Sequence, residues 1–328
     1  MNTTGMGAQQ EAHERVIDMI TTAMGPVAPY LDEPDVVEIM ANADGRIWIE
    51  RLGMGVRDSG EVISPAQAEN LLRLIASTMG LACHSDAPSL SAVLPGSGAR
   101  LQGFVPPVVA SPAFVLRKPA LRVFTLDEYV ADGIMTPAQR EVIEQAVTAR
   151  QNIVIAGGTG SGKTTLANAV LAVIAATGHR IVTLEDTQEL QCRAPNTLSL
   201  YTRSGVRTMR DLVIDTMRCR PDRIVVGEVR DGAALELCKA WVTGHPGGMA
   251  TLHSSSVRQA LTRLEQLVQE AVLHVPRPLI AEAVDMIIYM ARTGHGLRLH
   301  DIAAVEGYDH DTYVLRPLAA GTRSSPVR

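Results

Sequence analysis

Residues 157–164 read GGTGSGKT, which matches the phosphate-binding pattern G-x-x-x-x-G-K-[ST] at every fixed position. Glycines let a backbone turn tightly and bring its N–H groups onto phosphate oxygens. In this pattern Lys163 reaches the β- and γ-phosphates, and the hydroxyl of Thr164 binds Mg²⁺. The segment therefore predicts a site for a nucleoside triphosphate with Mg²⁺. Its expected members are Gly157, Gly158, Thr159, Gly160, Ser161, Gly162, Lys163, Thr164 and Thr165.

The sequence on either side of this loop supports the same interpretation. The apolar run at 153–156 is typical of a buried strand, and residues 166–176 behind the loop are expected to be helical. A helix N-terminus adds about half a positive charge where the phosphate would lie. The guanine-specifying pattern N-K-x-D is absent from the sequence, so we expect ATP rather than GTP. Lys163 is also one of only three lysines among 30 basic residues.

Two glutamates follow the loop at the ends of later strands. Glu185 ends the next expected strand, and Glu228 ends the one after it. Strand ends of a parallel α/β sheet face the ligand crevice, where a carboxylate can orient and deprotonate an attacking water. Gly227 stands where a Walker B aspartate is usual, which leaves Glu228 to bind Mg²⁺ through water or to position the nucleophile. The alternatives are a solvated acidic loop and a core strand that ends in glutamate by chance.

A histidine and several arginines are further candidates. Residues 244–253, GHPGGMATLH, form a glycine-rich turn and a strand that ends at His253, where an imidazole can hydrogen-bond the γ-phosphate or serve a purely structural role. Arginines also crowd residues 203–223. This crowding fits either a solvated helix with i,i+4 pairs or guanidinium groups offered to phosphate, in the same chain or across a subunit interface. The phosphate-sensing candidates there are Arg207, Arg218 and Arg220.

The second half of the chain alternates between buried-type strands and helices. This alternation is the signature of a mostly parallel, doubly wound α/β sheet. Three further strands are expected after it, at 285–292, 297–306 and 312–318. A helix is expected to start at Thr136-Pro137 and to run to about Arg150. The alternating strands that follow are expected at 152–156, 180–184, 223–226 and 249–252, and their helices at 163–177, 207–218, 231–243 and 257–270.

The first 120 residues have the pattern of a smaller α+β domain. Ser64 to Gln67 is a helix start, with a capping hydroxyl, a proline at the first helical position and a glutamine that reaches back. We expect that helix to end at Gly80. The other elements expected in this domain are a helix at 11–24 and strands at 36–40, 46–50, 100–105 and 113–117. The domains expected are an N-terminal α+β domain at 1–120, a linker with a short helix at 121–135 and an ATPase domain at 136–328.

The composition excludes several classes of protein. The net charge of −5 disfavours a dedicated duplex-DNA binder and direct sequence-specific binding of nucleic acid, and 3% aromatic residues are too few for a base-stacking surface. The four cysteines lie far apart, which excludes a compact zinc ribbon and fits reduced thiols in the cytoplasm. Neither a signal peptide nor an apolar run of membrane-spanning length is recognisable, so we expect a soluble intracellular protein.

Four segments taken together resemble a known family. GGTGSGKTT, TLEDTQEL, MRCRPDRIVVGEVRD and GHPGGMATLHSSS are similar, in this order, to the Walker A, Asp, Walker B and His boxes of the secretion-superfamily ATPases. A Walker B box without its aspartate is usual in that family. GARLQGFVPPV, FVLRKPA and FTLDEYVADGIM look like the type IV secretion branch, and most like its conjugal-transfer ATPases. The type IV pilus and type II secretion motors are the nearest rivals.

The resemblance implies a hexameric cytoplasmic motor that hydrolyses ATP with Mg²⁺. The fold it implies is a RecA-like P-loop NTPase domain with a smaller α+β N-terminal domain. It also implies partners among the inner-membrane components of a secretion or conjugation apparatus, and a peripheral position on that membrane. It assigns phosphate binding to Arg100 and Arg117, hydrolysis to Glu185 and Glu228, and the coupling of hydrolysis to movement to His253. With Lys163 of the phosphate loop, these two glutamates and the histidine are the expected catalytic residues.

Two functions from other classes are alternatives. A RecA-type nucleic-acid translocase would show ATP hydrolysis stimulated by DNA, and the weak charge and scarce aromatic residues count against it. A non-enzymatic scaffold, in which the nucleotide only stabilises an assembly, fits poorly with a complete phosphate loop and two candidate catalytic carboxylates. We therefore expect ATP hydrolysis that powers pilus assembly or substrate transfer.

Overall fold

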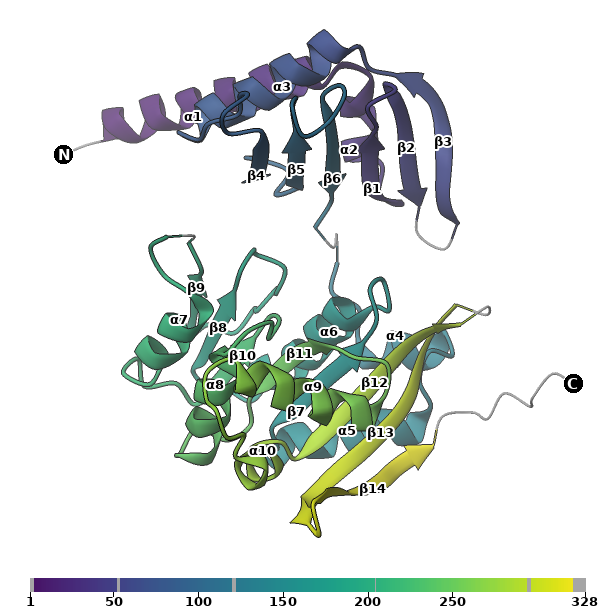
Figure 1. The fold of residues 1–328 in the computed structure, drawn as a ribbon, viewed down its shortest axis with the longest axis vertical. Helices are drawn as coiled ribbons and strands as arrows, with labels where there is room; N and C mark the ends of the chain where they lie inside the picture. Colours follow the sequence, from purple (N-terminus) through teal and green to yellow (C-terminus); the bar gives the residue numbers. More distant parts are fainter. Residues whose placement is uncertain (1–2, 52–53, 120–121, 204, 294–295, 321–328) are drawn as a thin grey trace, which may run out of the picture. The chain divides into compact units, whose positions relative to one another are not determined.

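The computed structural model describes residues 3–51, 54–119, 122–203, 205–293 and 296–320. The chain divides into two compact units, Met1–Leu121 and Arg122–Arg328, and each is described by itself (Figure 1). The short helix expected within 121–135 is α4 (Leu126–Ala131). It buries Leu126 and Tyr129 in a core cluster of the second unit, so the segment from Arg122 onward folds with that unit.

The first unit contains a six-stranded antiparallel sheet with the strand order β3-β2-β1-β6-β5-β4. Helices α1 and α3 lie side by side along this sheet (Figure 1). Helix α3 packs closely on the sheet, because a Cβ atom added at Gly103 of β5 would lie 2.3 Å from Leu72 of α3. The elements are α1 (Thr3–Met24), the 3-10 turn Gly25–Val27, α2 (Ala28–Asp32), β1 (Val36–Ala41), β2 (Arg46–Arg51), β3 (Gly55–Val62), α3 (Pro65–Thr78), β4 (Ser89–Val93), β5 (Arg100–Phe104) and β6 (Ala113–Arg117).

The helix start predicted at Ser64 is confirmed by its hydrogen bonds. The Ser64 hydroxyl accepts from the N–H of Gln67, and the Gln67 side chain accepts from the N–H of Ser64. The sequence does not predict the edge strands β3 and β4. β3 reads GVRDSGEV, is mostly exposed and lacks the apolar alternation by which a half-buried strand is recognised. β4 reads SLSAV, in which Leu90 and Ala92 alternate with serines, but this alternation extends over only five residues.

The second unit is the doubly wound sheet that the sequence predicts. Its order is β14-β13-β12-β7-β11-β10-β8-β9, in which β12 to β9 run parallel and β13 and β14 run antiparallel to their neighbours. The strands are β7 (Ile153–Gly157), β8 (Ile181–Glu185), β9 (Thr197–Tyr201), β10 (Arg223–Val226), β11 (Met249–His253), β12 (Met286–Thr293), β13 (Gly296–Asp309) and β14 (Thr312–Ala320).

Helices cover both faces of this sheet. α5 and α6 share a core cluster with Ile155 and Val225, while α7, α8 and α9 pack with Val154 and Ile224 on the opposite face. The sequence predicts these helices but does not predict α10 or the edge strand β9. The helices are α5 (Pro137–Thr148), α6 (Lys163–Ala175), α7 (Met209–Thr216), α8 (Ala233–Val242), α9 (Val257–Gln269) and α10 (Arg277–Ala283).

Asn152 joins three segments where the parallel strands begin. It is 4% exposed, and its side-chain oxygen accepts from the N–H groups of Gly247 and Gly248 at 2.8 and 2.9 Å. Its amide nitrogen donates to the carbonyl of Ala283 at 2.9 Å, and its own N–H donates to the carboxylate of Asp285 at 2.7 Å. The starts of β7, β11 and β12 are therefore held in register by one side chain.

Arg223 places a buried charge at the same end of the sheet, where the parallel strands begin. It is 1% exposed and donates to Nδ1 of His179 at 3.1 Å and to the carbonyls of Gly247 and Val147 at 3.0 and 2.9 Å. Burial, followed by the positive charge of Arg150, lowers the pKa of Arg223 to about 10. It therefore remains a cation at neutral pH, and three segments of the chain supply its acceptors.

The structure also bears on the exclusions drawn from composition. Among the described residues, no helix combines the length and apolar character needed to cross a bilayer. All four cysteines are free thiols, and Cys83 and Cys238 are buried. Burial raises the pKa of the Cys238 thiol to about 12, so this thiol is protonated and unreactive at neutral pH.

Candidate active site

The phosphate loop follows β7, every residue of which is buried, and leads into α6 at Lys163. Gly160 and Gly162 have φ values of +67° and +82°, a region that favours glycine. Gly157 is needed for space, because a Cβ atom there would lie 2.4 Å from the Ser161 hydroxyl oxygen and 2.5 Å from a carbonyl oxygen of β12. Gly158 has no neighbour within 4 Å of such an atom, so its position leaves room for a ligand.

Lys163 lies under this loop rather than in solvent. Its side chain is largely buried, with 7% of the residue exposed, and Nζ donates to the carbonyl oxygen of Gly158 at 2.7 Å. The hydroxyl of Ser161 donates to the same carbonyl at 2.8 Å. These contacts hold the ammonium group within the loop, where phosphate oxygens would compete with the carbonyl for it.

The other predicted side chains lie at the same end of the parallel strands as the loop. His253 pairs in register with Gly157, and Gly227 follows β10 beside Glu185, the last residue of β8. Ile181 and Val225 belong to the core cluster under α6, and side chains two residues apart on a strand share a face. Positions 185 and 227 therefore face the side of the sheet where Lys163 begins α6.

Glu185 is held in one orientation by the segment that follows it. It is 2% exposed, and its Oε1 accepts from the N–H groups of Glu189 and Leu190, both at 2.8 Å. Asn168 on α6 is 1% exposed and connects this segment to the helix, donating to the carbonyl of Glu189 at 3.0 Å and accepting from the N–H of Gln191 at 2.7 Å. The acidic segment is thus tied to the helix that begins with Lys163.

Glu228 lies between a histidine and an arginine. Its Oε1 is 3.2 Å from Nε2 of His253, and its Oε2 accepts from Arg230 at 2.9 Å. Arg230 is also 3.7 Å from the carboxylate of Asp186, which accepts from the hydroxyl of Thr202 at 2.8 Å. One guanidinium group therefore connects the ends of β8 and β10.

These contacts fix the charge state of both groups. Burial opposes ionisation of Glu228, but the hydrogen bond and charge of Arg230, with His253 and Lys163, hold the pKa of Glu228 below its usual value. Burial and then the nearby Lys163 lower the pKa of His253. At neutral pH the site therefore holds a carboxylate next to a neutral imidazole, a pair that can accept and relay a proton.

The arginine candidates predicted within residues 203–223 are Arg207, Arg218 and Arg220. They flank α7, whose buried residues Met209, Leu212 and Val213 pack opposite α6. Arg207 is 3.9 Å from Asp215, and Arg218 and Arg220 lie between α7 and the start of β10. The helix next to these three arginines therefore packs on the face of the sheet opposite α6, and their phosphate-sensing role stays a prediction.

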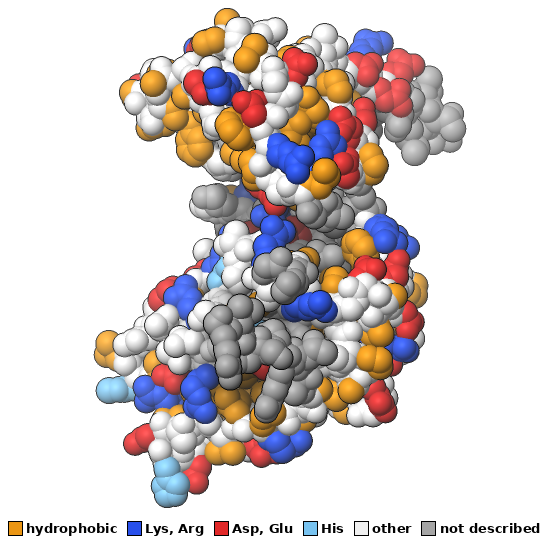
Figure 2. Space-filling view, turned by 90° about the vertical axis from the view of Figure 1, so that its right-hand side faces the viewer, with side chains coloured by type: hydrophobic (Ala, Val, Ile, Leu, Met, Phe, Trp, Pro, Cys, Tyr) orange, Lys and Arg blue, Asp and Glu red, His pale blue; other side chains and the backbone are white. Residues whose placement is uncertain are grey.

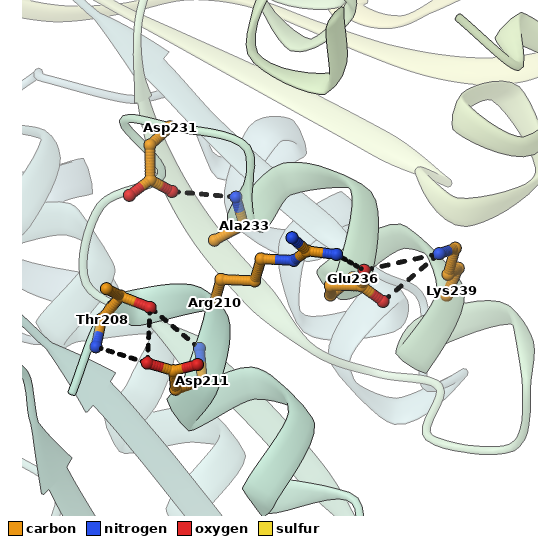
Figure 3. Close-up of polar contacts among 7 residues, drawn as sticks. All are labelled: Thr208, Arg210, Asp211, Asp231, Ala233, Glu236 and Lys239. Atoms are coloured by element: carbon orange, nitrogen blue, oxygen red, sulfur yellow. Dashed lines mark hydrogen bonds and ion pairs between the residues drawn. The ribbon is translucent and has the colours of Figure 1, made fainter. Parts of the chain in front are cut away.

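A fourth arginine of this segment has a structural partner. Arg210 donates to Glu236 of α8 at 2.9 Å, and Lys239 completes the cluster at 3.3 Å from the same carboxylate (Figure 3). Figure 3 also shows the capping box of α7, in which Thr208 and Asp211 bond each other. The arginine-rich segment thus joins two helices.

Arg100 and Arg117 lie on neighbouring strands of the first unit. Arg100 begins β5, Arg117 ends β6, and the two are directly opposite in the antiparallel register. Side chains of directly opposite residues project from the same face with Cβ atoms about 5 Å apart, and like charges there are unfavourable. Both arginines belong to the first unit, whereas the phosphate loop belongs to the second, and their phosphate-binding role stays a prediction.

Three residues of the site are missing from the expectation: Asn168, Asp186 and Arg230. Asp186 and Arg230 are adjacent to predicted residues in TLEDTQEL and GEVRD, but nothing in either segment indicates that they pair across 44 positions. The buried asparagine in an otherwise apolar helix is the signal for Asn168, since a buried amide needs hydrogen-bond partners.

Known proteins are similar to this chain along most of its length. A family model described as "Type II/IV secretion system protein" matches residues 21–295. The conjugal transfer protein TrbB of Rhizobium radiobacter is 48% identical over 308 residues, which cover 93% of this chain and 95% of that protein. The type IV secretion system protein VirB11 of Bartonella quintana is 29% identical over 295 residues, 78% of this chain and 82% of that protein.

A solved structure has a similar fold. The ATPase DotB of Legionella pneumophila matches with a TM-score of 0.58 and 21% identity over 81% of this chain and 74% of that one. The matched family range contains the phosphate loop, both acidic strand ends and His253, which confirms the expectation of a type IV secretion ATPase. The chain therefore belongs to the type II/IV secretion system protein family, as a secretion ATPase of its type IV branch.

Proposed function

We propose that the chain works as a hexameric ATP-driven motor, located peripherally on the cytoplasmic side of the inner membrane, for a conjugation or related type IV secretion apparatus. Its work would be pilus assembly or substrate transfer. The observation that carries the proposal is the placement of Lys163, Glu228 and His253 at one end of the parallel sheet. The 48% identity to a conjugal transfer protein along almost the whole chain supports conjugation over type II secretion and pilus retraction.

ATP binding would rely on the loop and the start of α6. The N–H groups around residues 158–164 and the ammonium group of Lys163 bind the phosphates. Mg²⁺, when bound, neutralises part of the phosphate charge, and its protein oxygens would come from Thr164 and, through water, from Glu228. These residues fit Mg²⁺, which prefers oxygen ligands and takes only one or two from the protein beside substrate phosphates.

Hydrolysis would rely on the two carboxylates. Glu228 is ionised next to neutral His253 and can accept a proton from the attacking water, while Glu185, fixed by two backbone N–H groups, orients that water. His253 touches Glu228 and can respond to the γ-phosphate, so loss of that phosphate would change the contacts at the end of β11. Arg100 and Arg117 are proposed as additional phosphate ligands, and a role for Arg207, Arg218 and Arg220 would require a neighbouring subunit.

The lysines provide a direct test of this assignment. Lys163→Ala should abolish phosphate release from ATP, because it removes the charge inside the loop, and should leave the assembly at about 211 kDa, six times the chain mass of 35.1 kDa. Lys239→Ala is the matched control, since that lysine pairs with Glu236 on α8. Wild-type turnover in Lys163→Ala, or equal losses in both variants, would contradict the assignment.

The nucleic-acid translocase remains the second candidate, and a DNA-stimulation assay separates it from the motor. On the face drawn in Figure 2, the coloured Lys and Arg side chains are interspersed with Asp and Glu in both units. A motor that serves a protein machine should hydrolyse ATP at the same rate with and without single-stranded DNA at low salt. A salt-sensitive stimulation would favour the translocase.

A further inference from the structure

Gly227 occupies the position at which P-loop proteins usually carry an aspartate, and its backbone is fixed on both sides. Its N–H donates to the carbonyl of Leu184 at 2.8 Å, and its own carbonyl accepts from the hydroxyl of Thr251 at 2.5 Å. It is not among the glycines with positive φ. Its backbone conformation is therefore open to other residues, and the reason for glycine here must be space.

The space is taken by Glu185. A Cβ atom at position 227 would lie 3.0 Å from Cγ of Glu185, 3.4 Å from its Oε1 and 3.6 Å from its Cβ. Carbon atoms in contact prefer about 3.5–4.0 Å, so Glu185 would have to move. It cannot move freely, because it is 2% exposed and its Oε1 accepts two hydrogen bonds from the following segment.

Position 227 and the Glu185 side chain face the same region. Position 227 lies beside Glu185 in the parallel pairing of β10 with β8, and both face the side of the sheet that α6 covers. A carboxylate at 227 and the carboxylate of Glu185 in its present orientation would therefore compete for one volume. The missing aspartate and the buried glutamate are two aspects of one arrangement.

We propose that Glu185, besides orienting the attacking water, would join Glu228 in holding Mg²⁺ through water. It would then supply from β8 the carboxylate that an aspartate at position 227 would otherwise supply from β10, and Gly227 is a positioning residue that keeps the space for it. This inference rests on the proposed function of the site. Gly227 then affects hydrolysis only because a larger residue would displace Glu185. The same arrangement explains why glycine stands at the aspartate position of the Walker B box.

A double-mutant cycle tests this dependence. Gly227→Ala should lower kcat at least tenfold with little change in KM, because the methyl group displaces Glu185, and Glu185→Ala should do the same. In the double variant the clash is gone, so Gly227→Ala should add nothing to the effect of Glu185→Ala. Additive losses, or a wild-type kcat in either single variant, would overturn the proposal.

A binding measurement gives a second readout that does not need turnover. The dissociation constant of a fluorescent ADP is measured with Mg²⁺ and with EDTA. The tightening caused by Mg²⁺ should shrink to the same extent in Gly227→Ala, Glu185→Ala and the double variant. An unchanged Mg²⁺ effect in Gly227→Ala would refute the positioning role, and this result is readable even if the wild type hydrolyses no ATP, which would reject the proposed function instead.

Gly232→Ala is the matched control for crowding. A Cβ atom there would lie 3.1 Å from the Cβ of Ala271, a comparable contact at the start of α8, again without positive φ. It should lower the melting temperature without changing the Mg²⁺ effect. If Gly227→Ala lowers the melting temperature too, the double variant should melt at the same temperature as Glu185→Ala alone, because only the Glu185 side chain collides with the new methyl group. A further drop in the double variant would count against the proposal.

Discussion

Glu228 is the residue whose state depends most on its neighbours. Its carboxylate is partly buried, which disfavours its charge, and the contacts with Arg230 and His253 more than compensate for this cost. Arg230 contacts Asp186 as well as Glu228, at 3.7 Å from the Asp186 carboxylate. At the scale of single residues, the site is therefore a bridged set of charges rather than one isolated base.

Replacing Arg230 should expose this dependence. Arg230→Gln should lower kcat by roughly ten- to a hundredfold, because Glu228 loses the bond that orients it, while KM for ATP changes little. Steady-state kinetics at saturating Mg²⁺ measure both constants. Arg210→Gln is the control: it breaks an arginine–glutamate bond of the same 2.9 Å length at similar exposure, on α7 and α8. Indistinguishable kcat values for the two variants would contradict the role given to Arg230.

At the scale of elements, the end of the sheet where the parallel strands begin contains a titratable histidine, His179, in contact with Arg223. Nδ1 of His179 accepts from Arg223 at 3.1 Å and lies 2.8 Å from the hydroxyl of Thr177. Burial, followed by the charges of Arg223 and Arg150, lowers the pKa of His179 from 6.5, with Asp222 opposing. Protonation would turn this acceptor into a donor that faces a buried guanidinium group.

This contact predicts a pH effect on stability with a definite sign. Between 6.5 and the lowered pKa of His179, the unfolded chain binds more protons than the folded chain, so stability falls as pH falls through that window. His179→Asn keeps an acceptor but cannot titrate, so its melting temperature should depend less on pH between 5 and 7. His310→Asn, at a side chain 93% exposed, is the control. Parallel curves for wild type and His179→Asn would exclude this contribution.

The elements also show what could be predicted from the sequence. The central strands were predictable because each is a short, continuous apolar run between helices, and the phosphate loop was predictable because its chemistry is carried by consecutive residues. The edge strand β9 reads TLSLY, in which Leu198 and Leu200 alternate with polar residues, but this alternation extends over only five residues and the strand pairs with β8 alone. Asn168 and Arg230 act through partners 21 to 44 positions away, so only the folded chain shows their roles.

At the scale of the whole molecule, two arginines of the first unit are proposed to bind the phosphate that the second unit holds. Arg117 has Glu38 beside it on β1 and Arg100 beside it on β5. Burial raises the pKa of Glu38, although the charge of Arg117 opposes this. Arg117 therefore lies between a carboxylate and a second cation on neighbouring strands.

Removing one of these charges should affect chemistry more than folding. Arg117→Ala should lower ATP turnover at saturating nucleotide while the melting temperature changes little, because the exposed guanidinium group contributes charge rather than core packing. Arg57→Ala, an exposed arginine on β3 of the same sheet, is the control and should leave both quantities unchanged. Unaltered turnover in Arg117→Ala would remove this arginine from the list of phosphate ligands.

The hydrogen bonds of Asn152 and Arg223 have a mechanical consequence for such a motor. They join the starts of β7, β11 and β12, the end of α5 and the turn before β11, all at the edge opposite the phosphate loop. Strands joined at one end resist sliding past one another, so the sheet should move as one rigid body. Force generated when the γ-phosphate leaves would then pass into the loops at the free end, instead of being dissipated as shear within the sheet.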